Sequence, residues 1–195
     1  MTRTFARARG GRVKVKLGDA DRGVVAGLLE SVADLLEPPP VPQDTAEPSS
    51  SDEAALFAQL EADLTVPPPT DPAVARLLPD ASRDDPELAQ SFRRLTEHDL
   101  RERKRGALGQ AAAALRRPSP VVLADSEAQA LLKGLTDVRL VLAERLGLAT
   151  DEDAEFLHAA LAAGARGGEQ EWAKAAELYE AVTYLQEELV RTILP

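Results

Sequence analysis

The sequence contains no cysteine, only two histidines and only 4% aromatic residues among its 195 positions. The lack of cysteine excludes a disulfide framework, a thiol nucleophile and thiolate metal sites, and it fits a reducing cytosol. Long apolar runs are missing as well. Residues 24–36, the most apolar stretch near the start, are interrupted by Glu30 and Asp34, whereas a membrane span needs about 18 apolar residues in a row. We expect a soluble, cytoplasmic protein without membrane contact or a targeting segment.

Acidic residues are absent from the first 18 positions, which contain six basic residues. Because the whole chain has a net charge of −10, the remaining residues carry −16. A surface this acidic repels nucleic acid and anionic membranes, so any contact with a polyanion has to be local. The six basic residues are Arg3, Arg7, Arg9, Arg12, Lys14 and Lys16.

Residues 4–17 alternate in polarity around a glycine pair at 10–11, which suits the positive φ angles of a two-residue hairpin turn. The pattern predicts a basic β-hairpin in which Arg9 faces Arg12 and Arg7 faces Lys14. Like charges opposite one another destabilise a hairpin, so a negative group should offset them. We favour the acidic helices of the protein itself, and the alternative is an external acidic partner or nucleic acid. The candidate residues for a partner surface are Arg7, Arg9, Arg12, Lys14 and Lys16.

Apolar residues recur at three- and four-residue spacing through much of the remaining chain, which predicts helices. Asp71 and Asp85 are each followed by proline and mark two helix starts. A fresh start near Thr96 would break the helix that begins at Pro86, and the sequence leaves open whether that helix continues to Leu115. The other expected helices cover residues 19–36, a short stretch after 53, residues 126–146, a segment from 150 and the C-terminal segment.

These elements predict a mainly α-helical fold, namely a helical bundle with an N-terminal β-hairpin and a proline-rich disordered linker. Within one domain overall, residues 1–37 form the basic β-hairpin plus a helix that packs on the main domain. Residues 38–52 form the disordered linker, and residues 53–195 form the helical domain. A glycine-rich turn at 164–168 precedes the last helix, whose broad apolar stripe places it in the core.

Residue types that carry catalysis are scarce. His98 and His158 lie among charged residues and lack the spacing of a metal site. The acids at 151–153 suit a helix N-terminus better than a calcium loop, because no glycine follows for the sharp turn. No nucleophile elbow, Walker loop or Rossmann fingerprint occurs. We therefore assign no catalytic, cofactor-binding or metal-binding residue and expect a non-enzymatic protein without cofactors.

The basic run at 101–105 has two interpretations. It could contact phosphates along a helix, but no aromatic residue that would stack on bases accompanies it. We favour a solvated helix face on which Arg101 and Arg105 pair with Glu97.

Asp137 and Arg139 interrupt an otherwise apolar helix. Burying an unpaired charge is costly, so each should have a partner. If this helix and the last one pack antiparallel, we expect Arg139 to pair with Glu187 or Glu188.

Several blocks in the middle of the chain resemble a known family in their order and spacing. They are Arg76-Leu77-Leu78-Pro79-Asp80, Asp84-Asp85-Pro86-Glu87, Phe92-Arg93-Arg94-Leu95-Thr96-Glu97 and Leu100-Arg101. The family is actinobacterial and is catalogued as a domain of unknown function, number two-zero-one-seven. The resemblance continues through residues 135–142 and 185–190 and covers nearly the whole chain apart from the linker. Family members often have tryptophan near Leu131 and Ala181 and asparagine in place of Thr136, so shared pocket aromatics are not implied.

The resemblance implies little about activity. Members of the family are often encoded beside the Clp protease adaptor ClpS, and some have a transcriptional-regulator label. We expect a cytoplasmic interaction or regulatory module whose partner is another protein, with a link to regulated proteolysis. The alternative is a nucleic-acid-binding transcriptional regulator that uses the basic hairpin, and the sequence leaves a homodimer open.

Overall fold

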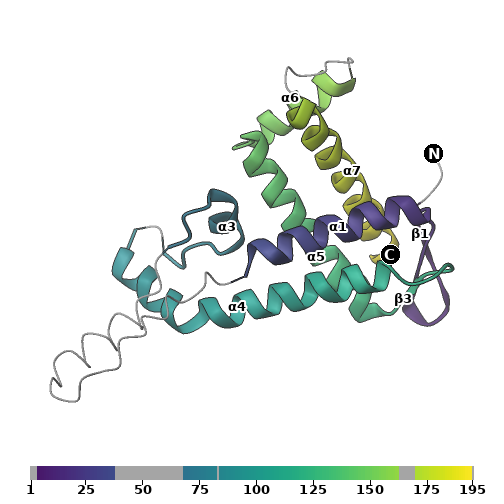
Figure 1. Cartoon of the computed structure of the whole chain (residues 1–195), viewed down its shortest axis with the longest axis horizontal. Helices are drawn as coiled ribbons and strands as arrows, with labels where there is room; N and C mark the ends of the chain where they lie inside the picture. The colour runs from purple at the N-terminus through teal and green to yellow at the C-terminus, as the bar shows by residue number, and fades with distance from the viewer. Residues whose placement is uncertain (1–3, 38–67, 83, 163–169, 195) are drawn as a thin grey trace, which may run out of the picture.

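Helices make up most of the structure, a computed structural model that describes residues 4–37, 68–82, 84–162 and 170–194 (Figure 1). This confirms the predicted mainly α fold with an N-terminal hairpin. The predicted linker, the short helix after residue 53 and the glycine-rich turn lie outside the described residues. In chain order the elements are β1 (Phe5–Arg7), β2 (Val13–Val15), α1 (Asp19–Leu35), α3 (Pro72–Leu77), α4 (Pro86–Leu115), β3 (Val122–Leu123), α5 (Asp125–Leu146), α6 (Asp151–Ala162) and α7 (Gln170–Ile193).

The helix starts follow the local sequence signals. Asp71 accepts a hydrogen bond from the Ala73 N–H at 2.8 Å, and Asp85 accepts one from the Leu88 N–H at 2.9 Å. Each aspartate therefore caps a helix whose next residue is proline. The acids at 151–153 form the first turn of α6, as the sequence predicts.

Helix α4 continues without a break from Pro86 to Leu115, which answers the question that the sequence left open. The Thr96 hydroxyl donates to the Phe92 carbonyl one turn earlier at 2.8 Å, so it does not cap a new helix. At about 1.5 Å per residue, the 30 residues of α4 extend over roughly 45 Å, and the 17 residues of α1 extend over only about 25 Å.

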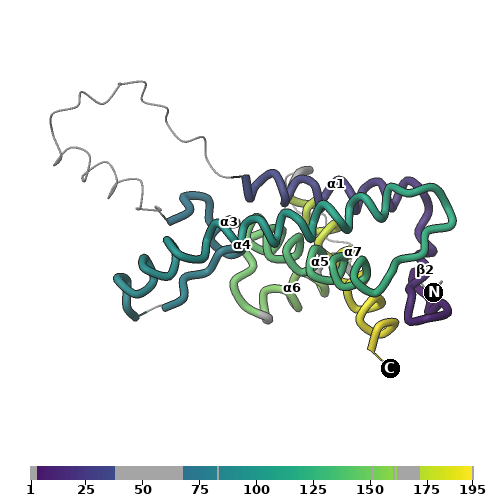
Figure 2. Tube along the Cα trace, turned by 90° about the horizontal axis from the view of Figure 1, so that it is seen from below, coloured from purple at the N-terminus to yellow at the C-terminus, as the bar shows by residue number. Residues whose placement is uncertain are grey.

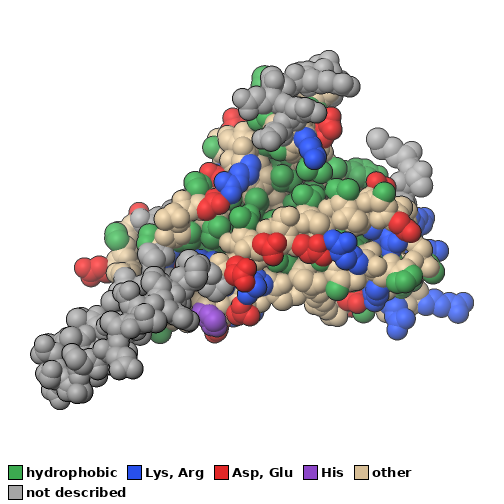
Figure 3. Space-filling model, in the orientation of Figure 1, with side chains coloured by type: hydrophobic (Ala, Val, Ile, Leu, Met, Phe, Trp, Pro, Cys, Tyr) green, Lys and Arg blue, Asp and Glu red, His purple; other side chains and the backbone are tan. Residues whose placement is uncertain are grey.

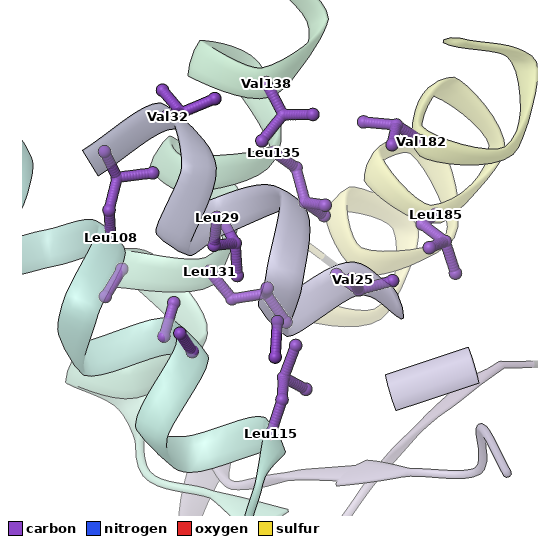
Figure 4. Packing of buried hydrophobic residues seen from close by; sticks show 14 of the residues in the cluster. Val25, Leu29, Val32, Leu108, Leu115, Leu131, Leu135, Val138, Val182 and Leu185 are labelled. Atoms are coloured by element: carbon purple, nitrogen blue, oxygen red, sulfur yellow. The ribbon is translucent and has the colours of Figure 1, made fainter. Parts of the chain in front are cut away.

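The core lies where α1, α4 and α5 meet. Helices α1 and α4 run side by side in both views (Figure 2). They are antiparallel, because the end of α1 at Leu36 contacts Arg101 and its start at Arg22 contacts Arg117. Leucines from all three helices are almost fully buried and point toward one another (Figure 4). These leucines are Leu29, Leu108, Leu115, Leu131 and Leu135.

Helix α7 packs against α5, and α6 covers the far end of this pair (Figure 1). Helices α5 and α7 are antiparallel, since Gln186 contacts Thr136 and Trp172 packs near Leu146. Val182, Leu185 and Leu189 join the main core, so the predicted apolar stripe of the last helix is confirmed. Tyr179 belongs to a second, smaller cluster beneath α6.

The hairpin has a different register from the predicted one. Phe5 pairs with Val15 and Arg7 with Val13, and residues 9–11 form a short 3-10 turn in which both glycines have positive φ angles. The predicted two-residue turn, with Arg7 opposite Lys14, is therefore wrong. The observed register places Phe5 in the core, 1% exposed, with Val13 and Val15 on the same face. Strand β3 completes a three-stranded antiparallel sheet beside β2.

Both interrupting charges of α5 have partners, as expected, but the partner of Arg139 is not the predicted one. Asp137 is buried and accepts from Lys104 of α4 at 2.6 Å. Arg139 donates to the Gln186 side chain at 2.8 Å and lies over the Tyr179 ring, 5.8 Å from its centroid. Glu187 and Glu188 instead pair with Arg191, so the predicted ion pair of Arg139 is wrong.

Candidate interaction surfaces

The five predicted partner residues lie together at the end of the molecule that holds the hairpin. We call Arg7, Arg9, Arg12, Lys14 and Lys16 the basic hairpin surface, and all five are exposed. Figure 3 shows lysine and arginine side chains gathered at this end. None of the five forms an ion pair with an acid among the described residues. The expectation that acidic helices of the protein neutralise them is not met by direct contacts there.

The positive charge of the basic hairpin surface affects the pKa of one acid, Glu127, without direct contact. Burial raises the pKa of Glu127, but the Ala124 N–H, the Arg117 guanidinium and the field of Arg12 outweigh burial, so its pKa is lowered. Glu127 itself hydrogen-bonds to Ala124 and Arg117. It caps the first turn of α5 and does not neutralise the hairpin by contact.

Arg7 differs from the other four because it has a structural role. Its Nε donates to the Thr192 carbonyl at 2.9 Å, and its Nη2 donates to the Ile193 carbonyl at 3.0 Å. These carbonyls end α7, where a cation offsets the negative end of the helix dipole. Arg7 therefore ties the hairpin to α7. Strand pairing alone could not have predicted this contact, because the two segments are 185 residues apart.

A groove runs between β1 and the end of α7. Its volume is about 300 Å³. We call it the β1 groove. It is lined by Phe5, Ala6, Arg7, Lys16, Glu188, Arg191 and Thr192.

A row of large apolar side chains is exposed on the first turns of α4. Leu88, Phe92 and Leu95 are 46%, 48% and 80% exposed, and their spacing of four and three residues places them on one side of the helix. We call these three residues the α4 apolar row. The sequence could not distinguish this row from a core stripe, because both have the same period.

The row is exposed because it lies on the side of α4 that faces away from α1 and the core, whereas Arg101 and Leu108 lie on the side that contacts them. The last turn of α1 lies beside Arg101, so α4 continues past α1 toward its own N-terminus. Beside the row, Ala89 is buried, and Ala89 and Phe92 line a cavity of only about 40 Å³ together with residues 78–81. Such a cavity has room for a water molecule or two but not for a substrate.

A buried ion network holds the extension in place. Glu97 accepts from Arg93 at 2.9 Å and from Arg101 at 2.7 Å, and Arg93 also pairs with Asp80. The prediction that Arg101 pairs with Glu97 is confirmed, but both residues are buried, so the predicted solvated face is wrong at this pair. Arg105 pairs with Glu102.

Both histidines are exposed. His158 Nδ1 lies 2.6 Å from a Glu180 oxygen, and the hydrogen bond to this carboxylate, with its charge, raises the pKa of His158. Among the described residues, nowhere do three or more metal-ligating side chains come together. In the same part of the chain, each helix is too short or too polar to cross a membrane.

Comparison with known proteins places the chain in a family. The model described as "Domain of unknown function (DUF2017)" matches residues 2–193. The chain belongs to this family. No curated protein and no solved structure was found to match it. In this DUF2017 protein, three of the sequence blocks noted above meet in the buried network, because they contain Asp80, Arg93, Glu97 and Arg101.

Proposed function

We propose that this DUF2017 protein is a non-enzymatic interaction module that binds another protein through the α4 apolar row. The observation that supports this is the exposure of Leu88, Phe92 and Leu95 side by side on one helix face. Apolar residues at this spacing are the anchors with which one amphipathic helix binds another protein. Burying the exposed part of each would contribute on the order of 1 kcal/mol.

The row is also rigidly presented. It lies on a regular helix whose opposite face is fixed by the Arg93–Glu97–Arg101 network. Binding a partner would therefore cost little conformational entropy in this segment, which favours affinity for a given contact area.

We place the partner in regulated proteolysis in the cytoplasm. The support for this part is the family resemblance seen in the sequence, which implies a gene neighbourhood with the adaptor ClpS. A regulatory module of this kind needs no active site of its own.

The test is site-specific photo-crosslinking in cells of the source organism. A photoreactive amino acid replaces Phe92, and in a matched control it replaces Phe156, which is 77% exposed on α6. We expect a defined protein adduct from position 92 that is absent from position 156. The adduct should disappear when Leu88 and Leu95 are both changed to serine. Equal adducts from both positions, or none from position 92, would contradict the proposal.

A second candidate is a nucleic-acid-binding regulator that uses the basic hairpin surface. The observation in its favour is that Arg9, Arg12, Lys14 and Lys16 are exposed and form no ion pair with a described residue. If all four contact phosphates of duplex DNA, the logarithm of the binding constant should fall with that of the salt concentration with a slope of about −3 to −4. Binding measured from low to high salt decides this: no binding, or a flat salt dependence, excludes the candidate.

A further inference from the structure

We propose that the β1 groove binds an extended acidic peptide, which adds to the sheet as a fourth strand beside β1. This surface lies apart from the α4 apolar row, so the inference can hold or fail whether or not the row binds a partner. Strand addition of this kind uses backbone hydrogen bonds for affinity and side-chain contacts for selectivity.

The backbone of β1 presents a free edge to the groove. The sheet has the order β1-β2-β3, so β1 is an edge strand. The Lys16 N–H donates to the Thr4 carbonyl, and the Ala8 N–H donates to the Arg12 carbonyl. The backbone groups of the even-numbered residues in and next to β1 therefore point toward β2. By the alternation of an antiparallel ladder, the N–H and C=O groups of Phe5 and Arg7 point away from β2. These groups have no hydrogen-bond partner among the described residues.

The positive charges around this edge favour a peptide with acidic side chains. Lys16 lines the groove without an ion pair among the described residues, and the other exposed cations of the hairpin are close by on the same short sheet. The one acid that lines the groove, Glu188, is already paired with Arg191 at 3.1 Å. A carboxylate brought in by a peptide would therefore meet unneutralised positive charge, whereas a lysine would be repelled.

A peptide fits this edge better than a nucleic acid does. The free groups of β1 are two backbone donors and two acceptors, and a second peptide strand matches them at the spacing of a sheet. Phe5, the aromatic residue of the hairpin, is 1% exposed and cannot stack on a base. The remaining chain carries a net charge of −16, which repels a long polyanion more than a short peptide.

The experiment is fluorescence anisotropy of the full chain with a labelled octapeptide of alternating threonine and glutamate. The comparison probes are the matched threonine–lysine octapeptide, the acidic octapeptide with alternate peptide nitrogens methylated, and oligodeoxythymidylate with the same number of charges. Methylation keeps the charges but removes the donors that a strand needs. We expect only the unmodified acidic peptide to bind well, with amide NMR shifts at Phe5 and Arg7.

Two charge reversals locate the site. Lys16→Glu should weaken binding of the acidic peptide roughly ten-fold or more. Lys133→Glu is the matched control, because Lys133 is exposed on α5 and does not line the groove, and it should change the affinity less than two-fold. Circular dichroism checks that both variants are folded.

Several results would overturn the inference. These are equal binding of the lysine peptide, equal binding of the methylated peptide, tighter binding of the oligonucleotide, no binding of the acidic peptide, or the same loss from both charge reversals. Tighter binding of the oligonucleotide would instead support the nucleic-acid candidate.

Discussion

Glu97 and Arg101 form a buried ion pair one helical turn apart, with Arg101 Nε 2.8 Å from Glu97 Oε1. Their side chains are only 7% and 10% exposed. The same carboxylate accepts from Arg93, and Arg101 also donates to the Leu36 carbonyl at 3.3 Å. This carboxylate therefore pairs with two largely buried cations and, through Arg101, connects the extension of α4 to the end of α1.

Replacing Glu97 with glutamine should destabilise the protein by about 3–5 kcal/mol. The change removes the negative charge and leaves Arg101 buried without a charged partner among the described residues, while Arg93 keeps only Asp80. Removing one partner is the costly way to break a buried ion pair. The matched control is Glu102→Gln on the same helix. Glu102 is 54% exposed and pairs with Arg105 at the surface, so its loss should cost less than about 1 kcal/mol. Urea unfolding followed by circular dichroism measures both, and equal effects would refute the prediction.

Replacing Gly134 with alanine should destabilise the protein by about 1–3 kcal/mol, although alanine favours helices. A Cβ at this position would lie 2.5 Å from Leu29 Cδ2 and 3.4 Å from Leu108 Cδ2. Leu29 is fully buried and cannot move away freely.

Gly109 of α4 provides the control for this prediction, since nothing lies within 4 Å of the position of its Cβ. Gly109→Ala should stabilise the protein by about 0.5–1 kcal/mol through helix propensity. Opposite signs in thermal unfolding are the expected result. A stabilising Gly134→Ala would mean that the three helices do not approach as closely as described.

Replacing Arg7 with alanine should cost about 1 kcal/mol, because two hydrogen bonds to the last carbonyls of α7 disappear. The last turn of α7 should then exchange its amide hydrogens faster. Arg9→Ala removes the same charge from the hairpin without a contact to α7 and should stay within about 0.5 kcal/mol of the parent protein. Chemical unfolding and hydrogen exchange provide the two measurements, and indistinguishable variants would refute the role of Arg7.

The contact between His158 and Glu180 should depend on pH. Its hydrogen bond and charge raise the pKa of His158 above 6.5 in the folded protein. A raised folded-state pKa means that the contact stabilises the fold fully below the unfolded value, and that this contribution is lost as the pH rises through the folded value.

Glu180→Gln tests this contact directly. The pKa of His158, followed by NMR of its ring proton, should return toward 6.5. The difference in stability between the parent and Glu180→Gln should be present near pH 5.5 and absent near pH 8.5. An unchanged titration of His158 in the variant would show that Glu180 does not cause the shift.

The helix starts were predictable because their signals are local. Asp71 and Asp85 each supply a cap next to proline, and these few residues determine their own hydrogen bonds. The hairpin register was not predictable in this way. The glycine pair allows turns of different length, and the burial of Phe5 selected the register in which Phe5 faces Val15, because a slip of one residue would turn Phe5 toward solvent.

The candidate surfaces were only partly predictable. The positive charge of the hairpin was predictable, because the first 18 residues contain six basic residues and no acid. The role of Arg7 depends on the end of α7, and the partners of Asp137 and Arg139 depend on how α4, α5 and α7 are rotated about their axes. Periodicity indicates that a helix has an apolar side but not which neighbour lies against it.

The sequence by itself determined the helical fold, most of the helix boundaries, the separation of charge between the hairpin and the rest, and membership of the DUF2017 family. Only the tertiary structure decided that Leu108 is buried and Leu95 exposed on the same helix. Apolar spacing is the same at both places, but Leu108 lies on the side of α4 that packs against the core, whereas Leu95 lies on the opposite side. Burial depends on the lengths and positions of neighbouring elements, which no local pattern contains.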